Sequence, residues 1–149
     1  MLDSGRAILL LNGKVAMILL DTSALIEFLN HTGSPCDRAI ENIILSRADA
    51  ALTDIVLTEV LQGIRLERDY REINESLLTF PVLSLKGPQS YIHAADIYRK
   101  CRAKGTTVRS TIDLLIAQAA IEHGAALLHK DRDFDAIASV SALKIFPVP

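Results

Sequence analysis

The chain lacks the residues that hold small disulfide-rich or zinc-bound folds together. Its 149 residues include only two cysteines, Cys36 and Cys101, and neither belongs to a CxxC motif or a Cys/His cluster. We therefore expect neither a disulfide framework nor a structural zinc site. Two isolated cysteines are typical of reduced thiols in a cytoplasmic protein, which is the location that we expect.

The chain also lacks tryptophan and long apolar runs, and aromatic residues make up only 5% of it. Its longest apolar stretch, residues 7–20, is broken by Asn12, Gly13 and Lys14, which makes it too short to span a membrane. A single Arg6 and the lack of a small-residue cleavage site argue against a signal peptide. We therefore expect no association with a membrane.

The chain also has almost no excess of charge of one sign, since its formal net charge is only -2. This excludes a globally basic nucleic-acid binder, but not a nuclease, because the active site of a nuclease is acidic. Hydrophobic residues make up 50% of the chain and charged residues 23%. This is enough apolar content for one folded domain with a core of Leu, Ile, Val and Ala.

Short apolar runs alternate with longer amphipathic segments along the chain. This alternation predicts an α/β fold built from βαβ units, with a parallel sheet that is covered by helices on both faces. We expect strands at residues 17–20, 50–52, 125–129 and 144–148, and helices at residues 24–29, 37–46, 54–66, 70–79, 88–103, 112–123 and 134–138.

Residues 1–16 do not fit this pattern. Asn12-Gly13 lies between the apolar runs 8–11 and 14–17 and predicts a β-hairpin. The first strand of a parallel sheet, if it lies in the middle, already has a neighbour on each side and has no free edge for such a hairpin. We interpret residues 1–16 as an extension that folding and activity do not need. Either it is a loose segment, or the natural start is Met17, so that the functional domain comprises residues 17–149.

Two aspartates follow predicted strands. Asp21 stands directly after the first strand, and Asp131 follows a later one. In open α/β sheets, ligands bind outside the carboxyl ends of the strands, so both positions are candidate functional sites. The alternative is that such an aspartate only caps the next helix. Ser23 offers another cap for the first of these helices, and Asp133 or Asp135 for the second.

Two further carboxylates lie on predicted helices. Glu59 is at the edge of the apolar face of its helix, where an unpaired carboxylate is costly. Asp113 occupies the first turn of a helix that is apolar nearly all round. Because Ser110 stands three residues earlier, as in a capping box, Asp113 taken alone is interpreted as structural.

Together the four carboxylates predict metal chemistry. If the strand ends and helix starts meet at one edge, each pair about 5 Å apart repels by about 3 kcal/mol at an effective dielectric constant of about 20. Such a cluster is tolerable only when some of the groups are protonated or a cation binds them. Oxygen ligands without cysteine or paired histidines favour Mg²⁺ or Mn²⁺ over zinc.

Four segments resemble the motifs of one family. They are DTSALIEFL from Asp21, LTEVLQG from Leu57, DLLIA from Asp113 and LLHKDRDFDAIA from Leu127. In this order they resemble the PIN-domain ribonucleases, and most of all the VapC toxins of bacterial type II toxin–antitoxin systems. The resemblance covers roughly residues 17–149; toxins of this type usually begin at the position of Met17. It implies a three-layer α/β/α PIN-like fold around a central, mainly parallel sheet.

The resemblance also implies an activity, Mg²⁺-dependent endonucleolytic hydrolysis of RNA, with Mn²⁺ as a substitute. The bound ion would lower the pKa of a water molecule and offset charge on the phosphate oxygens. It further implies a cognate antitoxin as partner and a homodimer. The implied site consists of the catalytic and metal-binding acids Asp21, Glu59, Asp113 and Asp131, of Asp133 as an additional or alternative ligand, and of the nearby hydroxyls of Thr22 and Ser23.

A local basic stretch leads into Asp113, since residues 97–112 contain no acidic residue, and two more basic residues flank Asp131. We hypothesise that these groups bind the phosphates of the RNA backbone, which makes binding salt-sensitive. The alternative is a solvated face whose cations only interact with a helix end. The residues are Arg99, Lys100, Arg102, Lys104, Arg109, Lys130 and Arg132.

Other functions fit the residues less well. A haloacid-dehalogenase-type phosphatase needs a second aspartate where this chain has Ser23, and a receiver domain needs an acidic pair where it has Asp21 alone. No Ser-His-Asp or Cys-His arrangement is evident, and His129 is interpreted as a side chain that fills the end of a strand. The remaining alternatives are a non-toxin PIN-fold nuclease and an RNA-binding module in RNA processing. Loss of the acids would mark the RNA-binding module.

Overall fold

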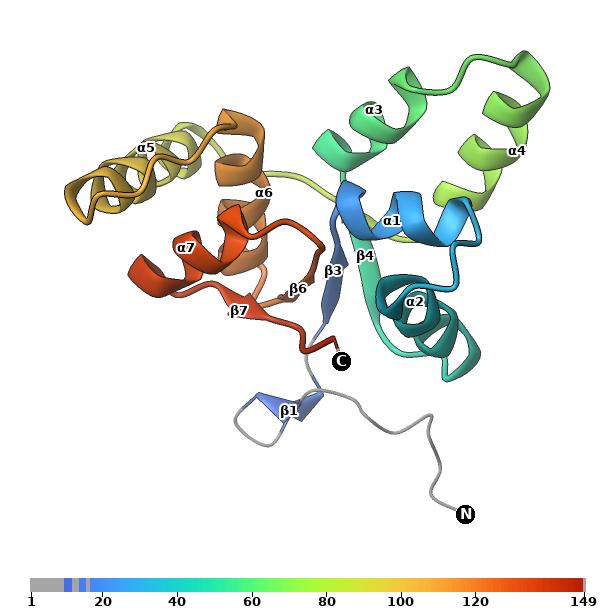
Figure 1. Cartoon of the computed structure of the whole chain (residues 1–149), viewed down its shortest axis with the longest axis horizontal. Coiled ribbons are helices and arrows are strands. Elements are labelled where there is room, and N and C mark those ends of the chain that lie inside the picture. Colours follow the sequence, from blue (N-terminus) through green and yellow to red (C-terminus); the bar gives the residue numbers. More distant parts are fainter. Residues whose placement is uncertain (1–9, 12–13, 16, 149) are drawn as a thin grey trace.

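The computed structural model describes residues 10–11, 14–15 and 17–148. At its centre is a five-stranded sheet with the order β5-β4-β3-β6-β7, in which all four pairings are parallel (Figure 1). The predicted α/β class with a parallel sheet is therefore confirmed. The strands are β3 (Ile18–Leu20), β4 (Ala50–Thr53), β5 (Val82–Leu83), β6 (Ala126–Leu128) and β7 (Lys144–Ile145).

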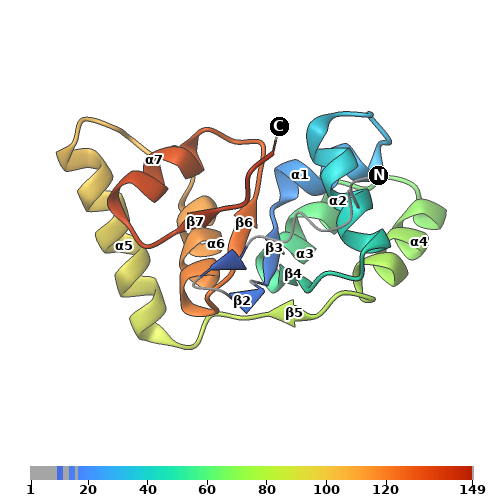
Figure 2. The ribbon, with the colours of Figure 1, turned by 90° about the horizontal axis from the view of Figure 1, so that it is seen from below.

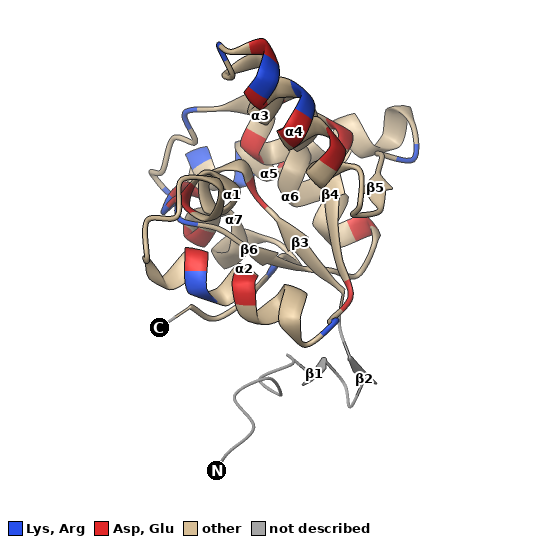
Figure 3. Cartoon of the chain, turned by 90° about the vertical axis from the view of Figure 1, so that its right-hand side faces the viewer, with Lys and Arg blue, Asp and Glu red and all other residues tan. Residues whose placement is uncertain are grey.

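The three central strands are buried along their whole length. A parallel strand that is covered on both faces needs apolar side chains at every position, which explains the uninterrupted apolar runs in the sequence. The strands β3 and β6 carry no charged residue and are tan throughout in Figure 3, whereas α4 carries charges of both signs.

The helices form a layer on each face of the sheet (Figures 1 and 2). Parallel strands are joined by right-handed crossovers, so connections that run in opposite directions across the sheet lie on opposite faces. The chain proceeds from β3 through β4 to β5, then returns to β6 and continues to β7. One layer holds α1 (Thr22–Leu29), α2 (Pro35–Leu45), α3 (Asp54–Gln62) and α4 (Glu67–Leu77), and the other α5 (Pro88–Ala103), α6 (Thr111–Glu122) and α7 (Asp133–Val140).

The core lies between the sheet and both helical layers and is mostly aliphatic, as the composition predicts. Leu19, Leu52 and Leu127 from the central strands are fully buried, together with Ile116 of α6. Phe134, in the first turn of α7, is the largest fully buried side chain. A continuous core under both layers is what holds the short strands in place.

Some element boundaries differ from the predicted ones. The edge strand β5 was not expected, because it has only two residues and neither is buried. Helix α3 ends at Gln62, followed by Gly63, instead of continuing to Leu66, which precedes α4. Gly124 follows the C-cap of α6 with a φ of 62°, a left-handed conformation that favours glycine at the end of a helix.

The predicted hairpin is present in the described residues ahead of the sheet. Strands β1 (Leu10–Leu11) and β2 (Lys14–Val15) are antiparallel, and they form a two-stranded sheet of their own. The other residues of the 1–16 segment lie outside the described residues. Within the part of the chain that the structure describes, no helix has the length and apolar character needed to cross a membrane.

We expect a chain that begins at Met17 to fold like the full chain, because β1 and β2 do not extend the five-stranded sheet. Its unfolding temperature should differ by less than about 4 °C, equivalent to about 1 kcal/mol. Thermal unfolding followed by circular dichroism measures this. Leu19→Ala in the full chain is the positive control, because a cavity in the core costs about 2–5 kcal/mol. A loss as large in the shortened chain would contradict the proposed boundary.

Candidate active site

The candidate site lies where the strand order reverses. From β3 the chain moves to β4 on one side, and β6 pairs with β3 on the other side, so the carboxyl ends of β3 and β6 flank the switch point. Leu20 and Leu128, the last residues of these strands, are partners in the register. Asp21 and the loop that carries Asp131 therefore emerge side by side, at the position where open α/β sheets bind ligands.

Asp21 is buried, with 3% of its surface exposed, and it is itself the N-cap of α1. Its Oδ2 accepts hydrogen bonds from the backbone N–H of Ser23 at 3.0 Å and from the Ser23 hydroxyl at 2.5 Å. Ser23 thus supports the cap and does not replace it. Burial raises the pKa of Asp21, and the hydrogen bonds from Ser23 oppose this rise by stabilising the carboxylate.

The two hydroxyls expected near the site both contact acids. Besides donating to Asp21, the Ser23 hydroxyl accepts the backbone N–H of Lys130 at 2.9 Å, which ties α1 to the loop after β6. The Thr22 hydroxyl donates to Oε1 of Glu59 at 2.8 Å. The first turn of α1 therefore contacts the acid that follows β3, the loop after β6 and the acid on α3.

Glu59 projects from α3, whose start is fixed by Thr53. The Thr53 hydroxyl accepts the backbone N–H of Val56 at 3.0 Å, as an N-cap does. The buried residues of α3 are Val56 and Val60, and Glu59 beside them is half-buried. Burial raises the pKa of Glu59, the hydrogen bond from Thr22 opposes this, and the charge of Asp21 raises it further.

Asp113 reaches the same edge because α6 begins there. Ser110 is the N-cap of α6, but its side chain makes no capping hydrogen bond, so the expected capping box is not formed. Burial, as the largest cause, and the charges of four other acids together raise the pKa of Asp113 to about 7. In order of decreasing influence they are Asp21, Asp131, Glu59 and Asp133.

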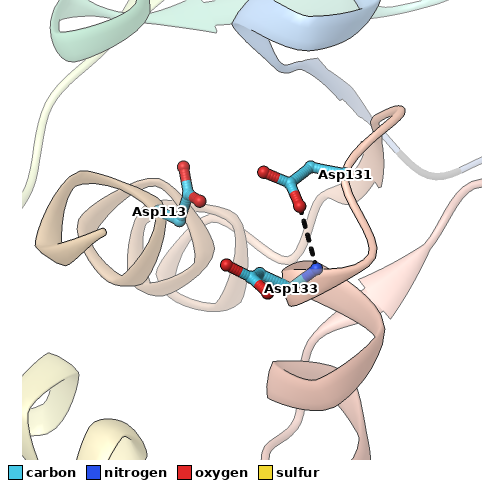
Figure 4. Close-up of side chains that lie close together, drawn as sticks. All are labelled: Asp113, Asp131 and Asp133. Atoms are coloured by element: carbon cyan, nitrogen blue, oxygen red, sulfur yellow. Dashed lines mark hydrogen bonds between the residues drawn. The ribbon is translucent and has the colours of Figure 1, made fainter. Parts of the chain in front are cut away.

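Three of these acids lie close together, as Figure 4 shows. One carboxylate oxygen each of Asp113, Asp131 and Asp133 lies within 4.8 Å of the others. Asp131 Oδ1 also accepts the backbone N–H of Asp133, the first residue of α7, at 3.0 Å. The N-cap of α7 is Arg132, so the expected cap by Asp133 or Asp135 is wrong. Three oxygens of like charge at this spacing match the ligands of a hard divalent cation.

Sequence reasoning missed two contacts beside this group. Nδ1 of His129 accepts the backbone N–H of Asp131 at 3.0 Å, so His129 does more than fill a strand end. Arg109 approaches Oδ2 of Asp133 with its backbone N–H at 3.4 Å and its Nε at 3.6 Å. The spacing of His129 two residues before Asp131 is a local signal for the first contact, whereas no local signal predicts the second.

The other predicted basic residues have contacts away from the three clustered acids, or are simply exposed. Lys130 forms an ion pair with Glu27 of α1, and Arg132 is exposed just before α7. On α5, Arg99 pairs with Asp96 at 3.6 Å, and the guanidinium of Arg102 lies 5.7 Å from the centre of the Tyr98 ring. The remaining two, Lys100 and Lys104, are exposed at the end of α5.

Comparison with known proteins agrees with the fold. Residues 18–140 match the family model of the PIN domain. Ribonuclease VapC11 of Mycobacterium tuberculosis is 36% identical over 129 residues, covering 86% of this chain and 96% of the relative. Ribonuclease VapC51 of the same organism is 32% identical over 123 residues, covering 83% and 86%.

Solved structures show the same fold at lower sequence identity. DNA-bound VapBC from Salmonella typhimurium superimposes with a TM-score of 0.70 at 21% identity, covering 88% of this chain and 97% of that one. VapBC-5 from Mycobacterium tuberculosis gives a TM-score of 0.64 at 23% identity, covering 89% and 99%. The chain therefore belongs to the PIN-domain family, and within it to the VapC ribonucleases.

The raised pKa of Asp113 predicts a pH-dependent stability in the absence of metal. Its pKa rises from an ordinary value of 3.8 to about 7, so the folded chain keeps a proton that the unfolded chain loses between these values. The folded state therefore loses stability as the pH rises through this window, and the loss levels off above it. After allowance for solvent screening, we expect on the order of 1–2 kcal/mol.

The measurement is urea unfolding of the wild type and Asp113→Asn in EDTA at a series of pH values. Because asparagine does not ionise, the stability of the variant relative to the wild type should increase from about pH 4 and level off above about pH 7. A difference between the two proteins that does not change with pH would contradict the raised pKa.

Proposed function

We propose that this chain is a Mg²⁺-dependent endoribonuclease that hydrolyses RNA phosphodiester bonds, and that it is the toxin of a type II toxin–antitoxin system. The observation that carries the proposal is the crowding of carboxylates at the switch point, where oxygens of Asp113, Asp131 and Asp133 lie within 4.8 Å of one another. Burial together with this crowding raises the pKa of Asp113 to about 7. The relatives named as VapC ribonucleases support the choice of RNA as substrate.

The residues fit a divalent cation. Asp113, Asp131 and Asp133 would hold it through oxygen atoms, and Asp21 and Glu59 would add negative charge next to it. Mg²⁺ suits such a site because it prefers carboxylate oxygens, and Mn²⁺ is the expected substitute. When bound, the ion supplies Lewis-acid chemistry, which activates a water molecule and offsets charge on the phosphate.

The residues of the chain contribute orientation and charge. Ser23 holds the buried carboxylate of Asp21, and Thr22 holds that of Glu59, so neither acid has to reorganise during the reaction. Asp113 retains a proton near neutral pH because burial, and after it the charges of the surrounding acids, disfavour its carboxylate. A cation offsets both causes, so its binding should release a proton from Asp113.

RNA binding is proposed for the basic residues around the acids. Arg109 contacts the acid cluster: its side chain is 69% exposed, and its Nε lies 3.6 Å from Oδ2 of Asp133. The exposed cations at the end of α5 extend the positive charge away from the acids. Phosphate contacts of this kind position the RNA without reading its sequence.

An antitoxin partner and a homodimer are part of the same proposal. The structure of VapBC-5, a member of the VapBC family of toxin–antitoxin systems, supports an antitoxin partner. A protein partner can bury the exposed apolar side chains of Ile26 on α1, Ile44 on α2 and Leu78 directly after α4. A pocket of about 430 Å³ between these helices contains Phe28 and Phe80 in its walls.

The acids are tested with purified protein and RNA. Asp21→Asn and Asp113→Asn should each lower kcat by about 10³-fold or more, and EDTA should abolish cleavage by the wild type. Asparagine is a good N-cap, so Asp21→Asn keeps the start of α1 and separates chemistry from folding.

Asp49→Asn is the matched control, because Asp49 is exposed and directly precedes β4, at the opposite end of the sheet from the acids. It should cleave RNA like the wild type. Full activity in either asparagine variant of the site would refute the assignment, and RNA binding without cleavage by the wild type would favour an RNA-binding module.

Arg109→Gln should weaken RNA binding at moderate salt and reduce the salt dependence by about one ion, because a phosphate contact is lost. Lys144→Gln is the control. Lys144 is exposed on β7 and pairs in register with Ala126, the first residue of β6, so it lies at the opposite end of the sheet from the acids. Both substitutions are made in the inactive Asp113→Asn protein, and fluorescence anisotropy with labelled RNA measures the affinity. An equal affinity with and without Arg109→Gln would contradict the role of Arg109.

A further inference from the structure

His129 is the residue that joins β6 to the loop carrying Asp131, and its ring lies inside the protein. The side chain is 7% exposed. Its ring lies against that of Phe134, with the ring centres 5.1 Å apart. A packing role explains this contact, but it does not explain the orientation of the two ring nitrogens.

The ring is oriented by Asp131. Nδ1 of His129 accepts the backbone N–H of Asp131, which requires that Nδ1 carry no proton and that the neutral ring carry its proton on Nε2. Nε2 is buried and has no hydrogen-bond partner within the described part of the chain; the nearest acid, Asp135, has its Oδ1 3.5 Å away. The hydrogen bond through Nδ1 is therefore the one that fixes the ring and the loop relative to each other.

This loop is held by side chains, because it has left β6 and has not yet entered α7. The N–H of Lys130 donates to the Ser23 hydroxyl at 2.9 Å, and the N–H of Asp131 donates to His129. The N–H of Asp133 donates to the carboxylate of Asp131. Backbone N–H groups outside a ladder need such acceptors, and the acceptors then decide the path of the chain.

We propose that His129 is a positioning residue, which holds the backbone of Asp131 so that its carboxylate faces Asp113 and Asp133. The proposal rests on the function proposed above, in which these acids bind a divalent cation. Groups that orient metal ligands commonly change metal affinity by about 10–100-fold when they are removed. His129 acts in this way through a backbone N–H, one step behind the carboxylate.

Two substitutions separate positioning from packing. In His129→Asn, the side-chain oxygen takes the place of Nδ1 and can accept the same N–H, whereas His129→Leu provides no acceptor. Both variants lose the ring that packs against Phe134. A purely structural role would therefore affect both variants alike, and their unfolding temperatures show how much packing each has lost.

The measurements are Mn²⁺ binding to the RNA-free protein by calorimetry and hydrogen exchange of the Asp131 amide by NMR. His129→Leu should weaken Mn²⁺ binding by about tenfold and accelerate exchange of this amide, and His129→Asn should restore both toward the wild type. Equal Mn²⁺ affinity in the wild type and His129→Leu, or an unchanged exchange rate, would overturn the positioning role alone. Absence of Mn²⁺ binding by the wild type would overturn the metal site and, with it, this role.

Discussion

The pairing of β3 with β6 is the constraint on which the rest of the site depends. Their register ends with Leu20 opposite Leu128, and the N–H of Asp21 continues the ladder by donating to the Leu128 carbonyl at 3.0 Å. Both strands are buried on both faces, so a shift in register would expose apolar side chains or bury polar ones. Because this register is fixed, the start of α1 and the loop before α7 meet at the same edge.

That edge carries an electrostatic cost that the fold offsets only in part. The carboxylates of Asp21 and Glu59 each accept hydrogen bonds from hydroxyls of α1. Burial and four neighbouring charges disfavour the ionised form of Asp113, so its carboxyl keeps a proton up to near neutral pH. Perturbed acids of this kind cluster at functional sites, where the same crowding that destabilises the folded chain favours a cation.

Much of the fold was predictable because its signals are local. The buried strands are continuous apolar runs, and the helices show apolar periodicity with recognisable ends, such as Thr53 before α3 and Gly124 after α6. The strand β5 escaped prediction because two exposed residues carry no pattern. Helix α2 begins at Pro35, after the Ser34 cap and two residues earlier than expected, since proline suits the first turn of a helix.

The sequence by itself determined the α/β class, the buried strands and which acids stand at strand ends and helix starts, because these depend on the order of neighbouring residues. Only the tertiary structure decided that Asp133 joins Asp113 and Asp131, that Asp113 titrates near neutral pH, and that His129 and Arg109 contact this group. These properties depend on distances between side chains from separate elements. The strand order and register set those distances, and no local pattern in the sequence encodes them.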